Sequence, residues 1–432
     1  MKKSSFYFLL ILSLSFIVSS SILFGDSKSR NLFSSVDFLI SNSPYYNYKY
    51  VRGFMSFNSD NWSIISEPSV IEKTVGKQLL GTDFSRLGVN GRFTQAYIKF
   101  TSMNWSFMLG RKKISIDNGI KNSIIHNFQF PAYDQFRFNL NFKKVSGQFF
   151  VGQLGSEKWE QKRIKRFIAG HDLSFSRLND RLTLIIGEQV IFTGENRSVD
   201  LMYLNPLIPY ISIHPDGDDL SINNFNNDNF MIYIVSIYKH NKNISFYGEI
   251  IIDDFQYRED PVQNMLGWKL GLKGELLFID SILKWLIDYT KIDSWTYIHS
   301  DRGQFTTWQN RGHSIGYPFG GDLQSLRFQA NSWIKQDILK ISIEYIWMEK
   351  GSNSIQTKSA NFNTLFDLYP TPPVKVFHMF ESSLTYNIKF ASLKTGYTNI
   401  PFPYEIANGL IEKLKLGFFF NLDIKHEFDI AI

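Results

Sequence analysis

The chain has 432 residues, a formal net charge of +6 and an aromatic content of 16%, with 40 Phe and 21 Tyr. It contains no cysteine, which excludes thiolate nucleophiles, thiolate metal sites, disulfides and a lipidated N-terminal cysteine. The small positive charge is typical of a solvated surface and is also compatible with anionic headgroups or acidic polysaccharide, but it does not indicate nucleic acid in an exported protein.

The N-terminus has the pattern of a secretory signal peptide. Lysines at positions 2 and 3 precede an apolar run over 6–18 and three serines. We therefore predict a signal peptide over 1–25. The alternative is a membrane anchor, because apolar residues resume at Ile22 and bring the segment to about twenty residues, just enough to span a bilayer. Charged residues interrupt every later apolar run before it reaches that length.

The next segment, 26–92, is less regular. Ile71, Val75 and Leu79 are spaced four apart ahead of Gly81, which predicts a short helix ended by glycine. Such a helix is too short to be stable alone, so we expect it to pack at the periplasmic side of a larger fold or to plug it. A first strand over 52–57 is compatible with the rest of this segment.

From Phe93 onward the sequence alternates between apolar and polar residues with a period of two, as β-strands do. In one such segment Leu384 belongs to the apolar face and Thr385 to the opposite face. The segments run for about ten residues, the length with which a tilted strand crosses a bilayer, whereas the strands of a soluble sandwich are shorter. The clearest examples are 136–143, 339–347, 380–390 and 422–432.

The alternation predicts an all-β protein. We expect a closed transmembrane β-barrel over 93–432, with about 16–18 antiparallel strands, because an open sheet edge in lipid would leave backbone groups unpaired. The high aromatic content fits the apolar band and interface girdles of such barrels. The expected location is the outer membrane of a Gram-negative bacterium, with outer-membrane lipid and the barrel assembly machinery as partners.

An acidic turn lies within "PLIPYISIHPDGDDL", at Asp216, Asp218 and Asp219. It is somewhat similar to an EF-type calcium loop but lacks the distal bidentate Glu of that pattern. We expect an exposed turn here. We predict no metal site and no cofactor in the protein.

Further carboxylates gather in "YGEIIIDDF". The alternation turns Glu249 and Asp253 toward the lumen, with Asp254 at the end of the strand. A retaining glycosidase holds its two carboxylates roughly 5–5.5 Å apart, but residues four apart on one strand are separated by roughly 13 Å. A calcium site at Asp253 and Asp254 is one alternative. Ion pairs with inward-facing Lys and Arg side chains are the interpretation we favour.

The densest polar passage is "WQNRGHSIGYPFGGDL", over 308–323. Its four glycines and Pro318 exclude a long regular strand and predict an exposed loop. A catalytic triad is not indicated, because His313 and Ser314 are adjacent and point in opposite directions in an extended segment. Aromatic faces combined with planar polar groups favour a saccharide platform; the alternative is a structural loop in which Arg311 pairs with Asp322. The predicted saccharide-binding residues are Trp308, Gln309, Asn310, Arg311, His313, Tyr317 and Asp322.

Five passages, in order from Leu109 to about Asp322, together resemble the Wzi-type family of capsule assembly proteins. They are "LGRKKISIDNG", "IIHNFQFPAYDQFRF", "YLNPLIPY" after "GEQVIFTG", "FYGEIIIDDFQ" and "RGHSIGYPFGGD". The resemblance implies a monomeric barrel of about eighteen strands. It also implies a lectin that binds or organises exported capsular polysaccharide or exopolysaccharide at the cell surface, without catalysis.

Two other functions stay open. The first is a passive porin or oligosaccharide channel, because inward residues that are long and mixed in charge fit either a filled lumen or an open one. The second is an outer-membrane hydrolase of the phospholipase sort. A hydrolase needs a Ser–His pair aligned across strands, which the sequence does not identify, so we expect no enzymatic activity.

Overall fold

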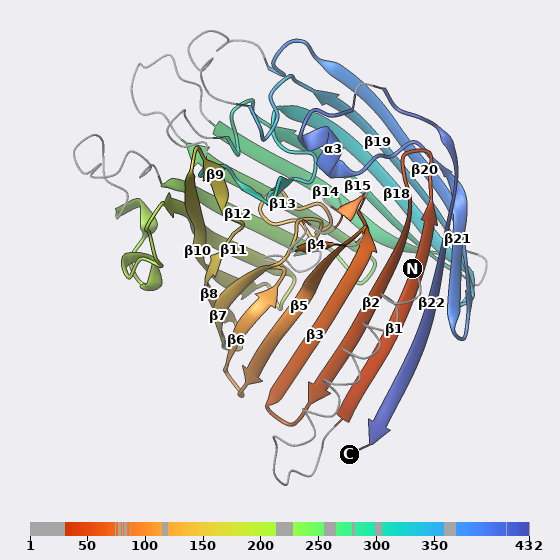
Figure 1. Cartoon of the computed structure of the whole chain (residues 1–432), viewed down its shortest axis with the longest axis horizontal. Coiled ribbons are helices and arrows are strands. Elements are labelled where there is room, and N and C mark those ends of the chain that lie inside the picture. Colours follow the sequence, from red (N-terminus) through yellow and green to blue (C-terminus); the bar gives the residue numbers. More distant parts are fainter. Residues whose placement is uncertain are drawn as a thin grey trace.

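The computed structural model describes residues 31–73, 75, 76, 79, 81, 84–86, 88–114, 120–212, 228–254, 265–278, 281–298, 305–357, 369–411 and 413–431. One antiparallel sheet closes on itself into a barrel (Figure 1). The first strand, β1 (Asn31–Asn42), pairs with the last, β22 (Gly417–Ala431), along the whole length of β1. Closure leaves no open sheet edge in the hydrocarbon layer, where unpaired backbone groups are costly.

The sheet contains 20 strands, of which β4 (Phe84–Arg86) and β9 (Glu157–Trp159) are three-residue pieces, so 18 strands form the wall. The predicted all-β barrel is thereby confirmed, at the upper end of the expected strand number. The other wall strands are β2 (Asn47–Asn58), β3 (Trp62–Glu72), β5 (Val89–Thr101), β6 (Trp105–Lys112), β7 (Tyr133–Asn141), β8 (Val145–Gln153), β10 (Lys162–Arg177), β11 (Leu182–Gly194), β12 (Asn229–Lys239), β13 (Ile244–Asp254), β14 (Met265–Phe278), β15 (Ser281–Ile292), β18 (Leu323–Lys335), β19 (Leu339–Lys350), β20 (Lys375–Ile388) and β21 (Ala391–Thr398).

The two ends of the barrel differ in the length of their connections. At the end where β1 begins and β22 ends, every connection between wall strands has two to four residues, as in 59–61, 178–181 and 389–390. At the opposite end the connections include 113–132, 195–228, 293–322, 351–374 and 399–416. Outer-membrane barrels have short periplasmic turns and longer extracellular loops. We therefore call these the periplasmic end and the extracellular end.

The outer face of the wall is apolar, as the period-two pattern predicts. On β20 the side chains of Phe380, Leu384 and Tyr386 are exposed, whereas Ser383 between them is buried inside. Leu384 is thus on the lipid side and Thr385 on the inner side. An apolar outer band with alternating inner residues is the arrangement that a barrel in a bilayer requires.

The region 26–92 differs from its prediction, because β1, β2 and β3 are full wall strands and the barrel begins at Asn31 rather than Phe93. The inner face of β1 carries Phe33 and Leu39 as well as Ser35 and Asp37, which blurs the alternation in the sequence. Where the helix was expected, Ile71 belongs to β3, and among the described residues the backbone N–H of Leu79 donates to the carbonyl of Val75 at 3.2 Å, the i to i−4 bond of an α-helical turn. Gly81 follows it with a φ of 54°, as a helix-ending glycine does.

Connections from the extracellular end fill part of the interior. Residues 120–132 and 305–322, here called the inner segments, pack in one buried apolar cluster with inward side chains of the wall such as Tyr233 and Ile346. The inner segments include the short strands β16 (Gln309–Asn310) and β17 (His313–Ser314). The helix α3 (Pro403–Ala407) lies against them, since Asn408 donates to the carbonyl of Gly312 at 2.9 Å.

Among the described residues, no helix has the length and apolar character needed to cross a membrane. The predicted signal peptide over 1–25 and the acidic turn at 216–219 lie outside the described residues, as does the side chain of Asp254.

Candidate functional site

The passage 308–323 lies inside the barrel, so the prediction of an exposed loop is wrong. Trp308 is only 1% exposed, and its indole N–H donates to the carboxylate of Asp253 at 2.7 Å. Tyr317 is fully buried and shares a hydrogen bond with Ser325 of β18 at 2.9 Å. A local pattern of glycine and proline predicts that regular structure ends, but it does not predict whether the chain then folds into the barrel or stays exposed to solvent.

The other polar residues of the passage divide into two groups. Asp322 is buried and accepts hydrogen bonds from the backbone N–H groups of Asn353 and Thr371, at 3.0 and 2.9 Å, so it organises the connection after β19. The ring of His313 lies against that of Tyr404 in α3, 4.7 Å between centroids. Gln309, Asn310 and Arg311, by contrast, lie near a cavity at the extracellular end.

The inward carboxylates Glu249 and Asp253 hold the inner segments in place. Glu249 accepts hydrogen bonds from the hydroxyl of Ser123 at 2.6 Å and from the backbone N–H of Ile124 at 3.0 Å. Asp253 accepts from the backbone N–H of Tyr297 at 2.7 Å in addition to the indole of Trp308. Both carboxylates therefore serve the packing of the interior. Among the described residues, no three His, Asp or Glu side chains gather as a metal site would require.

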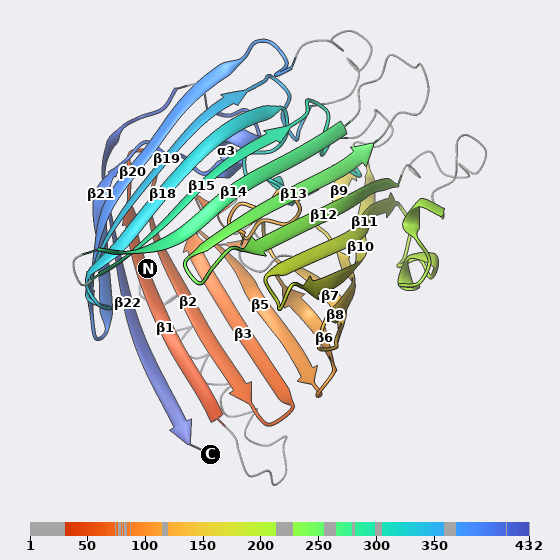
Figure 2. The same cartoon turned by 180° about the vertical axis from the view of Figure 1, so that it is seen from behind.

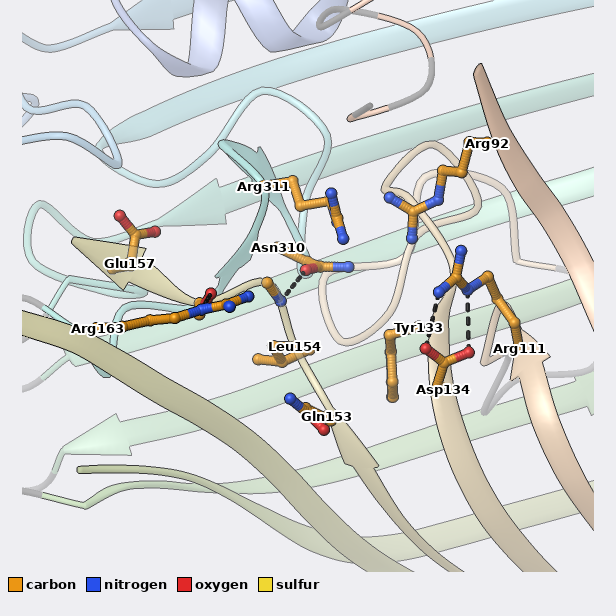
Figure 3. Close-up of a pocket in the computed structure, with 12 residues that line it drawn as sticks. Arg92, Arg111, Tyr133, Asp134, Gln153, Leu154, Glu157, Arg163, Asn310 and Arg311 are labelled. Atoms are coloured by element: carbon orange, nitrogen blue, oxygen red, sulfur yellow. Dashed lines mark hydrogen bonds and ion pairs between the residues drawn. The ribbon is translucent and has the colours of Figure 1, made fainter. Parts of the chain in front are cut away.

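The cavity at the extracellular end, here called the arginine cavity, has a volume of about 340 Å³. It is bounded by the extracellular ends of β5, β6, β7, β8 and β10, and by the tip of the β16–β17 hairpin (Figure 3). Four arginines and two carboxylates line it, which leaves a net charge of +2. These charged residues are Arg92, Arg111, Arg163, Arg311, Asp134 and Glu157.

Both carboxylates of the cavity already have partners. Asp134 receives two parallel hydrogen bonds from Arg111, at 3.0 and 2.7 Å, the bidentate geometry that fits a guanidinium to a carboxylate. Glu157 lies 3.8 Å from the guanidinium of the buried Arg166 and accepts from the amide of Gln309 at 3.3 Å. Arg92, Arg163 and Arg311 line the same cavity, and the buried guanidinium of Arg92 donates to the backbone carbonyls of Gly81, at 2.6 Å, and Ala132.

Arg311 reaches the cavity because of the turn on which it sits. Arg311 and Gly312 connect β16 to β17 with φ angles of 56° and 84°, both positive, as in the two-residue turns that suit β-hairpins. The guanidinium then donates to the carbonyl of Gly81 at 3.1 Å. A side chain at position 155 would place its Cβ 2.8 Å from the Cγ of Arg311. The position of the Arg311 side chain therefore also depends on the glycine at 155.

Asn310 and Arg163 complete the polar lining. The side chain of Asn310 bridges two neighbouring segments, because it accepts from the backbone N–H of Gly155 at 2.9 Å and donates to the carbonyl of Pro131 at 2.7 Å. Arg163 is exposed and donates through Nε to Ser156 at 2.7 Å. Figure 3 shows the guanidinium groups of Arg92, Arg163 and Arg311 directed toward the same space. Such an array suits a ligand that carries carboxylates or other planar anions.

Three of the four arginines were missed by sequence reasoning. Arg92, Arg111 and Arg163 lie on separate strands that pairing of the sheet brings together, and Arg311 joins them only because the connection 293–322 folds into the barrel. The one local signal is the "GR" at the end of β6, which contains Arg111. Whether Gln309, Asn310 and Arg311 contact saccharide stays a prediction.

The fold defines the class of protein. A closed barrel of 18 strands, apolar outside and with its long connections at one end, is a transmembrane barrel of the outer membrane of a Gram-negative bacterium. No family model and no curated protein matches the sequence.

The solved structures to which this chain is similar include a carbohydrate-binding barrel and porins. Escherichia coli Wzi, described as an outer membrane protein involved in group 1 capsule assembly and as a carbohydrate-binding β-barrel, has a TM-score of 0.63 and 14% identity over 91% of this chain and 84% of that chain. Pseudomonas aeruginosa OccD3 has a TM-score of 0.52 and 9% identity, over 94% of this chain and 93% of that chain. A BenF-like porin from Pseudomonas fluorescens has a TM-score of 0.52 and 8% identity, over 94% and 100%. At these identities the likeness shows the barrel fold alone, which a carbohydrate-binding barrel and porins share.

Proposed function

We propose that this barrel binds an exported capsular polysaccharide or exopolysaccharide with acidic groups, at the arginine cavity, without catalysing a reaction. The observation that carries the proposal is the convergence of Arg92, Arg163 and Arg311 on one cavity at the extracellular end. Guanidinium groups match carboxylates in shape and charge, and they keep their charge at any physiological pH. The protein acts as a monomeric, lectin-like anchor in the outer membrane and needs no cofactor.

Two observations support this direction. Wzi of Escherichia coli, whose barrel this chain resembles in fold, is described as binding carbohydrate. The cavity also lies on the side of the membrane where exported polymer is found, given the orientation of the long connections. A cavity of this volume accommodates a short stretch of a sugar chain rather than a large ligand.

The runner-up is a passive porin or oligosaccharide channel, since two of the similar structures are porins or porin-like in fold. Against an open channel stands the interior of this barrel. The inner segments share one buried apolar cluster with inward residues of β8, β10 to β13, β15 and β18 to β20. An interior packed with apolar side chains differs from the polar, water-filled lumen of a porin.

The decisive experiment is polymer binding by purified protein in detergent, with polygalacturonate as the acidic probe and dextran as the neutral one. The variants R163A and R311A should each weaken polygalacturonate binding about tenfold or more, because a hydrogen bond to a charged group contributes roughly 1.5–3 kcal/mol. The matched control is R181A, which removes the same charge from the periplasmic turn 178–181. Equal binding by all four proteins, or equal affinity for dextran, contradicts the proposal.

A further inference from the structure

The first part of the connection after β11 lies outside the barrel wall. Residues 197–212, here called the outer shelf, contain two single-turn helices, η1 (Met202–Leu204) and η2 (Tyr210–Ser212). In Figures 1 and 2, which view the molecule from opposite sides, this yellow-green segment lies beyond β10 and β11, away from the lumen. Its contacts show which surface of the wall it covers.

The outer shelf is seated on outward-facing side chains. Tyr203 and Tyr210 are buried in a cluster with Phe167 of β10 and with Val190 and Phe192 of β11. Positions two apart on a strand share a face, and on β10 this row continues through 169 and 171 to Leu173, which is exposed on the outside. The shelf therefore covers this outer surface near the extracellular end, whereas toward the periplasmic end the same surface is exposed.

A polar pair on this outer surface accounts for the position of the shelf. His171 of β10 and Glu188 of β11 are register partners with 2.8 Å between ring nitrogen and carboxylate oxygen. The backbone N–H of Tyr210 donates to the same carboxylate at 2.6 Å, and the Tyr210 ring lies edge-on to His171 at 4.5 Å. Polar side chains that face lipid are costly unless they find partners. The shelf gives Glu188 a hydrogen-bond donor, the backbone N–H of Tyr210, and the Tyr210 ring packs against His171.

The outer shelf is tied to the wall through Arg197, at its start, and through Tyr203. Arg197 forms two hydrogen bonds with Asp228, which directly precedes β12, at 2.5 and 2.8 Å. The hydroxyl of Tyr203 donates to Asp228 at 2.7 Å. These contacts hold the shelf against the barrel wall, so the same side of the shelf always faces away from the wall.

That free side is apolar. Leu207 is 88% exposed, and no residue from Leu201 to Ser212 carries a charge. The exposed large apolar side chains of the shelf are Val199, Leu201, Met202, Leu207, Ile208 and Ile211. So many exposed apolar side chains on one connection are characteristic of an interaction surface.

We infer that the outer shelf is immersed in the lipid of the outer leaflet, with its apolar side chains among the acyl chains. The shelf is continuous with the lipid-facing surface of the wall. Leu173 and Ile186, the register partners next to His171 and Glu188, are exposed on the lipid-facing wall, and the shelf continues that surface toward the extracellular end. A short uncharged segment with tyrosines toward the protein and leucines outward has the character of an interfacial anchor. This contact with lipid is independent of polysaccharide binding.

The absence of cysteine makes the test direct. A single cysteine at Leu207, labelled with an environment-sensitive fluorophore, is compared in phosphatidylcholine liposomes with two reference positions. L270C reports the lipid-facing wall, since Leu270 is 60% exposed on β14, and L178C reports a water-facing turn, since Leu178 is 63% exposed between β10 and β11. Nitroxide-labelled acyl chains quench probes in lipid, and iodide quenches probes in water.

We expect L207C to behave as L270C does, with strong quenching by the nitroxide lipid and little by iodide. Quenching like that of L178C would place the shelf in water and overturn the inference. Protection from both quenchers would mean that protein covers the shelf, a second copy for instance, and would overturn it as well. Because Leu207 points away from the barrel, the variant should retain the unheated mobility of the wild type on gels, which checks the fold.

Discussion

At the scale of single residues, Glu249 joins the wall to the material inside the barrel. Its carboxylate accepts hydrogen bonds from Ser123 and from the backbone of Ile124, and its side chain is fully buried. An orphaned buried donor costs about 1–3 kcal/mol, more than the hydrogen bond itself contributes. The interior of this barrel is therefore sensitive to the loss of one carboxylate.

The variant E249A should lower the free energy of unfolding by about 2–6 kcal/mol, because two buried donors lose their acceptor. The control is E275A: Glu275 pairs with Lys284 at 3.0 Å near the periplasmic end, both side chains are about half exposed, and such pairs contribute about 0–1 kcal/mol. Thermal melting in detergent measures both. If E249A and E275A have the same melting temperature, Glu249 does not hold the inner segments in place.

His126 makes the interior sensitive to acid. Burial lowers the pKa of His126 from its ordinary 6.5 to about 4, although its hydrogen bond with Gln189 acts in the opposite direction. The unfolded chain thus takes up a proton near pH 6.5, and the folded chain does so only near pH 4. Stability from the neutral ring is complete above pH 6.5 and is lost as the pH falls toward 4, by up to about 3 kcal/mol.

We expect the melting temperature of the wild type to fall between pH 7 and pH 4.5 by more than that of H126Q, which carries no titrating ring at this position. The variant H240Q, in an exposed periplasmic turn, should behave as the wild type does. Parallel pH profiles for the wild type and H126Q would show that the ring at position 126 does not sense acid.

At the scale of elements, β20 shows how one strand serves two environments. Its outward residues Phe380, Leu384 and Tyr386 meet lipid, while its inward Glu381 forms an ion pair with Lys394 of β21. A cation at the bilayer midplane on the lipid side costs roughly 2–4 kcal/mol, and an inward position tolerates one.

The variant L384K should therefore assemble into membranes much less efficiently than T385K, although the two substitutions are neighbours. Heat-modifiable mobility of membrane fractions measures the folded share of each variant. Equal yields would mean that the faces of β20 are assigned the wrong way round.

Strand faces such as these were predictable, because alternation is a local property of the sequence. Regions with mixed inner faces were not. On β1, Phe33 and Leu39 face inward beside Ser35 and Asp37, so the pattern does not distinguish the two sides. The helix predicted from the spacing of Ile71, Val75 and Leu79 does not begin at Ile71, because Ile71 pairs with β2 and β5 as part of β3.

At the scale of the whole molecule, the filled interior sets the expected electrical behaviour. The inner segments and α3 occupy the space that a porin of similar strand number leaves to water. We predict that the purified protein keeps strand-rich circular dichroism in detergent and gives no large, stable conductance steps in planar bilayers. Large steady currents would favour the channel function over the binding function.

From Phe93 onward the wall of this protein is predictable from local sequence pattern, whereas its interior depends on long-range packing. The length of the strands and the side that each residue faces follow from neighbours a few positions away, so they can be read from the period of two. The arginine cavity cannot be read in this way, because Arg92 and Arg311 become neighbours only when the long connection 293–322 folds into the barrel. For the same reason the passage 308–323 is recognisable as irregular from its glycines, whereas its burial depends on partners such as Asp253, 55 residues away from Trp308 along the chain. Local pattern determines a strand, and long-range packing determines what that strand encloses.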